Sequence, residues 1–459
     1  MASTRVAPRA TSPRPCNGRG EFCFGGAFLF ASRVFCRGLS ELIGQPVEVA
    51  GWLERSRKVG RQLAFWVVRD QSGWVQVVLG GELAALTPPL ESVVRVSGRV
   101  VVSRSAQGYE LQAELAEVLT EALAVLPFEI NQPEVKAGLD LQLDHRVLSL
   151  RHPKVRAAFR VKAVIGQAFR SFLSERGFTE VQTPKIVATG TEGGAELFTM
   201  QYFEQPAFLA QSPQFYKQML VAAGFERVFE VAPAFRAEEH NTSRHTNEFI
   251  SLDLEIGFVD DENILMDLEN ELLIYVLEQL RQRSQPELDL LEVELPNLTQ
   301  IPRLPLAAAQ VLLQERYGHP SPTGNLDPQG ERLLCQHAAE EHGVSAVFVT
   351  RYPKAHRPFY ALTCQDEPEL TCSFDLLLNG MEVTTGGLRI HRLTELLAAM
   401  LERNLKPESY QFYLEAFELA APPHGGFAIG LERLTARLLS LENVRQTTLF
   451  PRDRTRLVP

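Results

Sequence analysis

The chain has 459 residues, 45% of them hydrophobic, and a formal net charge of −10. This length accommodates two or three domains of ordinary globular composition. No run of about 18 apolar residues occurs, which excludes a typical membrane-spanning helix. The acidic balance argues against nonspecific coating of DNA.

The cysteines form neither a CxxC pair nor a cluster with histidine at the spacing of a zinc site. Free thiols are typical of a reducing compartment, so we expect a cytoplasmic protein. The six cysteines are Cys16, Cys23, Cys36, Cys335, Cys364 and Cys372.

Residues 1–36 are rich in Arg, Pro, Ser and Gly and contain one acidic residue, Glu21. Three interpretations are open: a disordered extension, an organelle-targeting segment, or a stretch upstream of the true start of translation. The shortage of acids is typical of a transit peptide, but Pro8, Pro13 and Pro15 would interrupt an amphipathic helix. We favour a disordered or wrongly assigned extension.

Residues 37–123 have the pattern of a first domain built from short strands. Apolar or alternating runs are separated by glycine-rich turn signals. The runs cover residues 47–53, 63–69, 74–79, 93–102 and 110–119. Five such strands are typical of the OB-fold, a small closed barrel. A basic cluster before the second strand marks the side that we expect to face RNA. It consists of Arg55, Arg57, Lys58 and Arg61.

Residues 124–150 contain Pro127 and few periodic signals, which indicates a hinge. The second domain, residues 151–459, opens with helical spacing over residues 155–176, and this helix is expected to stop before Gly177. Further along, residues 260–283 look helical, whereas 296–343 have no clear pattern.

The stretch FRAEEHNTSRHTNEFISLDLE, residues 235–255, carries the strongest chemical signal. An apolar run precedes Arg236, a polar loop follows, and apolar and polar residues then alternate. This pattern predicts two antiparallel strands joined by a long loop. Arg236, Arg244 and His245 would face one ligand, for which the fixed donors of a guanidinium suggest a phosphate. Phe249 would stack on a base.

Three stretches of the second domain resemble, in order, the three motifs of class II aminoacyl-tRNA synthetases. They are SERGFTEVQTPKI (174–186), FRAEEHNTSRHTNEF (235–249) and GGFAIGLERLTARLL (425–439). The second motif resembles that of archaeal-type aspartyl-tRNA synthetases. The chain between the second and third motifs is too short for the large extra domain of bacterial-type aspartyl enzymes, which also favours the compact archaeal type. The resemblance covers residues 37–459.

The resemblance implies an α+β fold with two parts. These are an N-terminal OB-fold barrel that binds the anticodon and a C-terminal antiparallel sheet flanked by helices. The helix of the first motif and the strand that leads to Pro184 would build the interface of a homodimer, which is also the commonest soluble assembly.

For ATP, the resemblance implies that Arg236 holds the α-phosphate. Arg433 and His245 would meet the outer phosphates, and Glu238 and Phe249 would hold adenine. Activation of a carboxylate by ATP depends mainly on positioning and on neutralising charge.

The resemblance also implies a magnesium ion, held by Asp375, Glu382 and Thr385 through hard oxygen ligands. Arg236, Arg433 and Glu382 are then the expected catalytic residues. In the reaction, the α-carboxylate of L-aspartate attacks the α-phosphorus of ATP, and a terminal ribose hydroxyl of tRNA then attacks the aspartyl-adenylate.

Further short stretches of the second domain, compared with the same family, predict a pocket for the amino acid. Glu192, in a glycine-rich stretch typical of a closing lid, would bind the ammonium group of the substrate. Gln214 and Lys217 lie three apart, so in a helix they share a face. Lys217 and Arg389 would bind the side-chain carboxylate, and Tyr360 would border the pocket.

In the barrel, the resemblance implies that Phe65 and Gln76 read the central uridine of the anticodon, the first by stacking and the second through an amide. Glu54 departs from the histidine or tryptophan that relatives usually carry. This position bears on whether tRNA(Asn) is charged as well as tRNA(Asp). We lean towards an enzyme that charges both with aspartate and needs a partner amidotransferase.

Two alternatives remain. One is an asparaginyl-tRNA synthetase or an amide-forming relative, against which Lys217 and Arg389 argue. The other is a non-catalytic tRNA-binding paralogue, which would usually have lost Arg236, Glu382 or Arg433.

Overall fold

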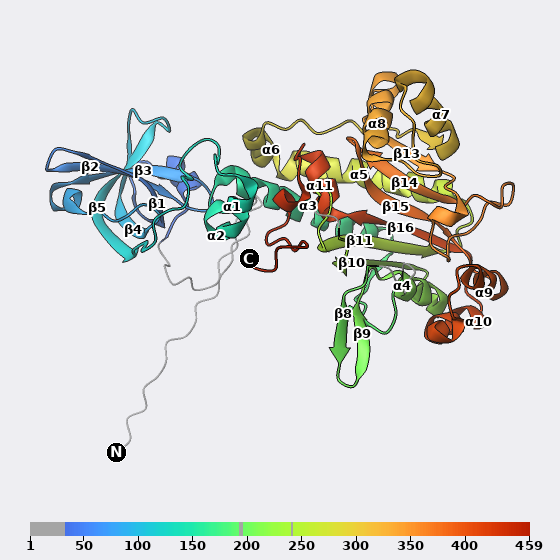
Figure 1. Ribbon diagram of the computed structural model, residues 1–459. Coiled ribbons are helices and arrows are strands. Elements are labelled where there is room, and N and C mark those ends of the chain that lie inside the picture. Colours follow the sequence, from blue (N-terminus) through green and yellow to red (C-terminus); the bar gives the residue numbers. More distant parts are fainter. Residues whose placement is uncertain (1–32, 192–195, 240–241) are drawn as a thin grey trace, which may run out of the picture. The chain divides into compact units, whose positions relative to one another are not determined.

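The computed structural model describes residues 33–191, 196–239 and 242–459. They form two compact units that divide between Leu126 and Pro127 (Figure 1). The stretch expected to be a hinge therefore contributes mainly to the second unit, where it holds two short helices, α1 (Leu139–Asp144) and α2 (Arg146–Ser149). No helix in these described ranges is long and apolar enough to cross a membrane.

The first unit is a closed five-stranded barrel with the strand order β1-β2-β3-β5-β4. The strands are β1 (Pro46–Val59), β2 (Leu63–Arg69), β3 (Trp74–Gly80), β4 (Val93–Val102) and β5 (Tyr109–Thr120). Trp66 is fully buried inside, and a short 3-10 helix, Cys36–Leu42, adds Cys36 and Leu39 to the same core. The expected OB-fold is confirmed, and Cys36, one residue before the expected start of the domain, packs into its core.

Strand β1 is longer than the sequence pattern indicated. It pairs with β4 through residues 46–52 and then with β2 through residues 52–59, with a bulge between Leu53 and Arg55. The bulge bends the strand from one neighbour to the other. Arg55, Arg57 and Lys58, expected in the segment before β2, therefore lie on β1 itself.

The second unit is organised around an eight-stranded sheet with the order β12-β13-β14-β15-β16-β11-β10-β6. Its strands are β6 (Thr179–Glu180), β10 (Arg227–Phe235), β11 (Glu248–Gly257), β12 (Arg303–Pro305), β13 (Ala346–Thr350), β14 (Ser373–Leu378), β15 (Met381–Arg389) and β16 (His424–Gly430). Neighbours are antiparallel except β6 with β10 and β12 with β13. A small separate sheet contains β7 (Ile186–Val187), β8 (Thr199–Tyr202) and β9 (Gln205–Leu209).

The helices flank this sheet, which confirms the expected α+β fold. They are α3 (Pro153–Glu175), α4 (Gln214–Leu220), α5 (Glu262–Arg283), α6 (Gln285–Leu291), α7 (Leu306–Tyr317), α8 (Pro328–His342), α9 (Leu393–Glu402), α10 (Gln411–Glu418) and α11 (Leu431–Leu438). Helix α3 starts with proline and ends before Gly177, whose φ is +78°. The segment without a clear sequence pattern supplies β12, α7 and α8.

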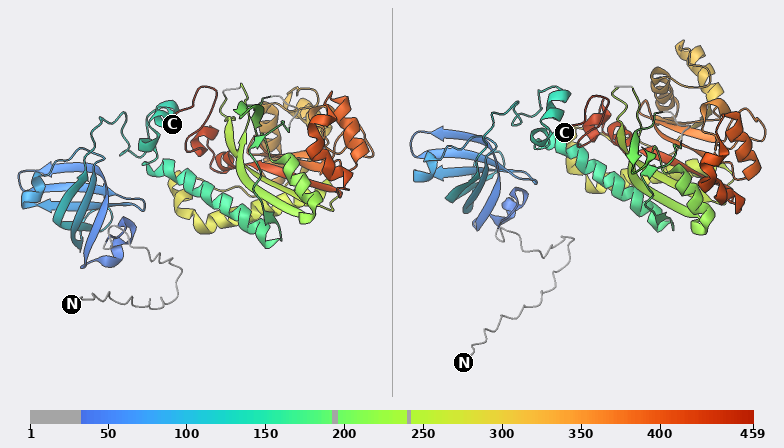
Figure 2. Two further views of the ribbon diagram at one scale, coloured as in Figure 1. Left: turned by 90° about the horizontal axis from the view of Figure 1, so that it is seen from below. Right: turned by 60° about the horizontal axis from the view of Figure 1, so that its bottom comes forward.

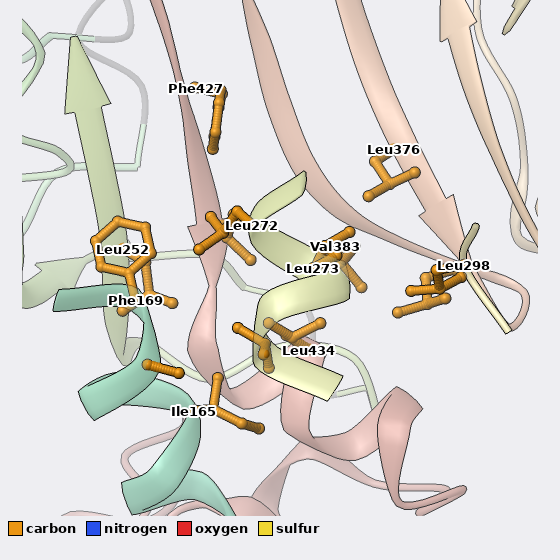
Figure 3. Packing of buried hydrophobic residues seen from close by; sticks show 14 of the residues in the cluster. Ile165, Phe169, Leu252, Leu272, Leu273, Leu298, Leu376, Val383, Phe427 and Leu434 are labelled. Carbon is orange, nitrogen blue, oxygen red and sulfur yellow. The ribbon is translucent and has the colours of Figure 1, made fainter. Parts of the chain in front are cut away.

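Helices α3 and α5 lie side by side along one face of the sheet (Figure 2). Their apolar stripes pack on side chains from β11, β14, β15 and β16, and Figure 3 shows Ile165 and Phe169 of α3 near Leu252 of β11. Successive strand residues point to opposite faces. Residues of β11 that alternate with Leu252 and Leu254 therefore point away from the helices, and this second face carries the candidate site.

Candidate active site

Strand β11 places Phe249, Ser251, Asp253 and Glu255 in one row on the face of the sheet that points away from α3 and α5. The neighbouring strand β16 presents only small residues beside this row, because Ser251, Asp253 and Glu255 pair with Gly430, Ala428 and Gly426. A Cβ atom on Gly426 would lie 2.4 Å from the Oε2 atom of Glu255. Small residues at these positions leave room above the sheet.

One end of the row opens into a cavity of about 130 Å³. The predicted residues that line it are Arg236, Glu238, Arg244, His245, Phe249, Glu382, Thr385 and Arg433. Sequence reasoning missed further lining residues, namely Thr246, Ser251, Val383, Ala428, Gly430, Glu432 and Val444. Most of these are small or apolar and leave no chemical signal in a sequence.

The first wall of the cavity comes from the loop between β10 and β11. The guanidinium of Arg236 lies 5.6 Å from the ring centroid of Phe249, within the range of a cation–π contact. Arg236 and His245 each approach the carboxylate of Glu238, at 3.8 Å and 3.7 Å. The side-chain nitrogen of Asn247 donates to the carbonyls of Arg236 and Glu238, which holds the loop against the strand end.

The opposite wall joins β15 to α11. The Nη1 atom of Arg433 lies 3.4 Å from Oε1 of Glu382. Glu331 of α8, which sequence reasoning missed, accepts from the backbone nitrogen of Glu382 at 3.0 Å and also binds the guanidinium of Arg244. Arg244 thus lines the cavity while its charge is held by a protein carboxylate.

The three predicted magnesium ligands lie close together. Asp375 pairs with Thr385 across β14 and β15, and the hydroxyl of Thr385 donates to Glu382 at 3.3 Å. Oδ2 of Asp375 accepts from Arg357 at 2.7 Å, whereas its buried Oδ1 has no hydrogen-bond partner among the described residues. Burial and the charge of Asp375 raise the pKa of Glu382.

This donor set fits a magnesium ion. Two carboxylates and a hydroxyl are hard ligands, and Mg²⁺ usually completes its shell with water and substrate phosphates rather than with a full protein cage. The described ranges hold no group of three or more His, Cys, Asp or Glu side chains placed to hold a metal ion. An added cation would relieve the repulsion that raises the pKa of Glu382.

At the other end of the row, two buried cations meet Glu255. The Nζ atom of Lys217 lies 3.2 Å from Oε2 of Glu255 and 3.1 Å from Oδ1 of Asp253. Arg389 donates from Nε to Oε1 of Glu255 at 3.0 Å and from Nη2 to the carbonyl of Gly426 at 2.9 Å. Burial by itself would raise the pKa of Glu255, but Arg389 and Lys217 hold it below its usual value.

Sequence reasoning missed Asp253 and Glu255. Their signal was two carboxylates at alternate positions of a strand, which places both on one face. Two other predicted pocket residues lie at the same end of the row. The ring of Tyr360 lies 5.7 Å from the guanidinium of Arg389, and Gln214 is buried at the start of the helix that carries Lys217.

These pocket residues do not line the cavity. Lys217, Gln214, Tyr360 and Arg389 are buried and are absent from the lining of the cavity. Glu192 falls outside the described residues. Pro184 lies in the loop between β6 and β7.

In the barrel, Phe65 and Gln76 lie on the same outer face. Gln76 stands opposite Val67, two residues from Phe65, and donates to Glu110 at 2.9 Å. The guanidinium of Arg57 lies 5.3 Å from the ring of Phe65.

Glu54 stands at the bulge of β1. Its Oε2 atom accepts from Nε of Arg69 at 3.1 Å, and Arg69 also binds both oxygens of the buried Glu91. The carboxylate of Glu54 is thus tied into a largely buried network rather than extended into solvent.

Comparisons with known proteins agree with this arrangement. A family model described as tRNA synthetases class II (D, K and N) matches residues 138–454, and an OB-fold nucleic acid binding domain matches residues 47–119. An aspartate–tRNA(Asp/Asn) ligase of Deinococcus radiodurans is 48% identical over 93% of this chain and 99% of its own length. An aspartate–tRNA(Asp) ligase of Pyrococcus horikoshii is 44% identical over 91% of this chain and 97% of its own.

Among solved structures, the asparaginyl-tRNA synthetase of Pyrococcus horikoshii with asparaginyl-adenylate superposes with a TM-score of 0.85. It is 33% identical, and the match covers 93% of this chain and 99% of the other. The resemblance inferred from the three motifs is confirmed, and the chain belongs to the class II tRNA synthetases of the D, K and N group.

Proposed function

We propose that this protein is an aspartate–tRNA ligase, which activates L-aspartate with ATP and transfers it to tRNA(Asp). The observation that carries the proposal is the pair of buried cations, Lys217 and Arg389, at the end of a row that begins in the cavity. Glu255 already meets both cations, and the carboxylate of aspartate accepts stronger, charge-assisted hydrogen bonds from them than the amide of asparagine does. Curated relatives named as aspartate ligases support the same choice.

The ATP site in this proposal is the cavity. Arg236 holds the α-phosphate, Phe249 stacks on adenine beside Glu238, and Arg433 and His245 meet the outer phosphates. Arg244 contributes from the same loop. Because these groups are fixed before the reaction, they lower the barrier by positioning the α-phosphorus and by neutralising charge.

Asp375, Glu382 and Thr385 would hold magnesium, which supplies positive charge for the phosphates when bound. The buried Oδ1 of Asp375, without a hydrogen-bond partner among the described residues, supports this assignment. Arg357 holds the other oxygen of Asp375 and so fixes the carboxylate in place.

The substrate ammonium needs acceptors as well. Oδ2 of Asp253 is buried and has no hydrogen-bond partner in the described ranges, which supports a role for Asp253 in binding the ammonium. Gln214 and Tyr360 complete the pocket, and Glu192 would close over it from the neighbouring loop. The α-carboxylate is then directed towards the α-phosphorus held by Arg236.

For tRNA, Phe65 and Gln76 would read the central anticodon base, and two copies of the chain would form a homodimer through the region of Pro184. We propose that tRNA(Asn) is charged with aspartate too. The carboxylate of Glu54 is engaged by Arg69 and is therefore a poor reader of a neighbouring base, and the Deinococcus radiodurans relative is named for both tRNAs. A tRNA-dependent amidotransferase would then convert the mischarged product, and we place the enzyme in the cytoplasm.

The test is to charge purified tRNA(Asp) and tRNA(Asn) transcripts separately with labelled aspartate, and again with labelled asparagine. We expect charging of both transcripts with aspartate and of neither with asparagine. A preference above about a hundredfold for tRNA(Asp), roughly 2.7 kcal/mol, would reject the relaxed tRNA range. Charging with asparagine alone would reject the aspartate ligase itself.

A further inference from the structure

Two cysteines outside the site already described lie against each other. The Sγ atoms of Cys364 and Cys372 are 3.3 Å apart. Cys364 is buried and Cys372 is partly exposed.

The two cysteines lie diagonally across an antiparallel pairing. Thr363 pairs with Thr371, and the backbone nitrogens of Cys364 and Cys372 donate to Leu370 and Leu362, each at 2.9 Å. A disulfide bond is about 2.05 Å long, so the sulfurs need to approach by about 1.2 Å, a movement that side-chain rotation and a small backbone shift supply.

We propose that Cys364 and Cys372 are a redox modification site, whose reversible disulfide alters the aspartate pocket. The oxidant is a low-molecular-weight disulfide. Its sulfur–sulfur bond breaks, a bond forms between the two Sγ atoms, and two protons and two electrons pass to the oxidant, which leaves as two thiols. The hydrogen bond donated by Cys372 lowers the pKa of Cys364 and raises the pKa of Cys372, so Cys364 is the thiolate that attacks the oxidant and Cys372 closes the disulfide.

The backbone links this pair to the pocket. Leu388 donates to the carbonyl of Cys372 at 2.9 Å and accepts from Leu362 at 3.0 Å, so both cysteine segments flank it. The next residue is Arg389, which pairs through its backbone with Ala361 and through its side chain with Glu255. Drawing the sulfurs together therefore strains the segments that position Arg389.

The modification itself is tested by peptide mapping of the full-length protein. The protein is incubated with oxidised or reduced glutathione, alkylated, and digested with trypsin and a glutamate-specific protease. Cleavage after Glu369 separates Cys364 from Cys372 only when they are not linked. We expect a linked pair after oxidation that dithiothreitol dissolves. Its absence would overturn the proposal.

The effect on the pocket rests on the proposed function and is measured by ATP–pyrophosphate exchange. Oxidation is expected to raise the KM for aspartate by about threefold or more while the KM for ATP stays constant. Cys364→Ser and Cys372→Ser should each abolish this sensitivity, whereas Cys335→Ser, in a different core cluster, should keep it.

An unchanged KM in the linked enzyme, or sensitivity that persists in both serine variants, would overturn the regulatory role. Failure of the proposed function looks different, because the reduced enzyme would then lack aspartate-dependent exchange while the linked peptide still formed.

Discussion

The two ends of the β11 row hold their positive charges in different ways. In the cavity, the side chains of Arg236 and Arg433 are 39% and 26% exposed and face open space. In the amino-acid pocket, those of Lys217 and Arg389 are only 4% and 8% exposed, and both already bind Glu255.

The difference follows from the cost of burying charge. An arginine that keeps contact with water needs no tightly bound anion, so Arg236 and Arg433 make only long contacts with Glu238 and Glu382, at 3.8 Å and 3.4 Å, which phosphates can replace. A cation removed from water needs a partner at all times. Glu255 and Asp253 therefore neutralise the amino-acid end in the empty enzyme. The comparison predicts that mutations at the buried end disturb both stability and activity, and mutations at the open end activity alone.

The largest effect is expected for Lys217→Ala. It leaves Asp253 and Glu255 with one cation fewer in the interior, which typically costs about 3–5 kcal/mol of folding free energy. It also removes a cation that binds the side-chain carboxylate of the substrate. We expect aspartate-dependent pyrophosphate exchange to disappear and the Tm to fall.

The matched control is Lys185→Ala, which removes a less buried lysine bound to the buried Glu230 at 2.9 Å. This variant should lose stability but retain exchange. Near-normal exchange in Lys217→Ala would remove Lys217 from the pocket.

At the open end, Arg236→Ala and Arg433→Ala should each slow adenylate formation by about a hundredfold or more, the usual scale for one electrostatic contact to a transition state. Because these side chains are partly solvated, the Tm should change little. Single-turnover adenylate formation and thermal melting check both statements. A large loss of stability in either variant would contradict the distinction between the two ends.

The smallest effect on activity is expected at Glu269, which lies in the core behind the sheet. Burial raises its pKa to about 8, and Thr384 donates to it at 2.5 Å. The folded protein thus holds a proton that the unfolded chain releases above its ordinary pKa of 4.5. The contribution of the Glu269 carboxyl group to folding stability is therefore complete below pH 4.5 and is lost as the pH rises towards 8.

Glu269→Gln should therefore melt at a higher temperature than the wild type at pH 8 and show a smaller advantage at pH 5, since each pKa unit corresponds to about 1.4 kcal/mol. Glu292→Gln, at an exposed position, serves as the control. An advantage that does not grow with pH would show that Glu269 stays ionised in the fold.

The sequence by itself determined the secondary structure of the barrel and of several elements of the second unit. The two-residue period of the barrel strands and of β10 and β11, and the helical spacing that became α3, are local properties of the chain. The second motif also identified residues that line the cavity, because Arg236, His245 and Phe249 lie on one loop and the strand that follows it.

Only the tertiary structure decided which charges neutralise one another. Glu331 reaches Arg244 from a helix that no pattern revealed, Glu255 joins Lys217 to Arg389, and Arg69 engages Glu54 beside a bulge. These partners are far apart in the chain, and their contact depends on strand register and on the placement of helices. The periodicity of the sequence indicates which face of an element a residue occupies. The energy of a buried charge depends on the groups that contact it, and these contacts form only when the sheet and its helices pack.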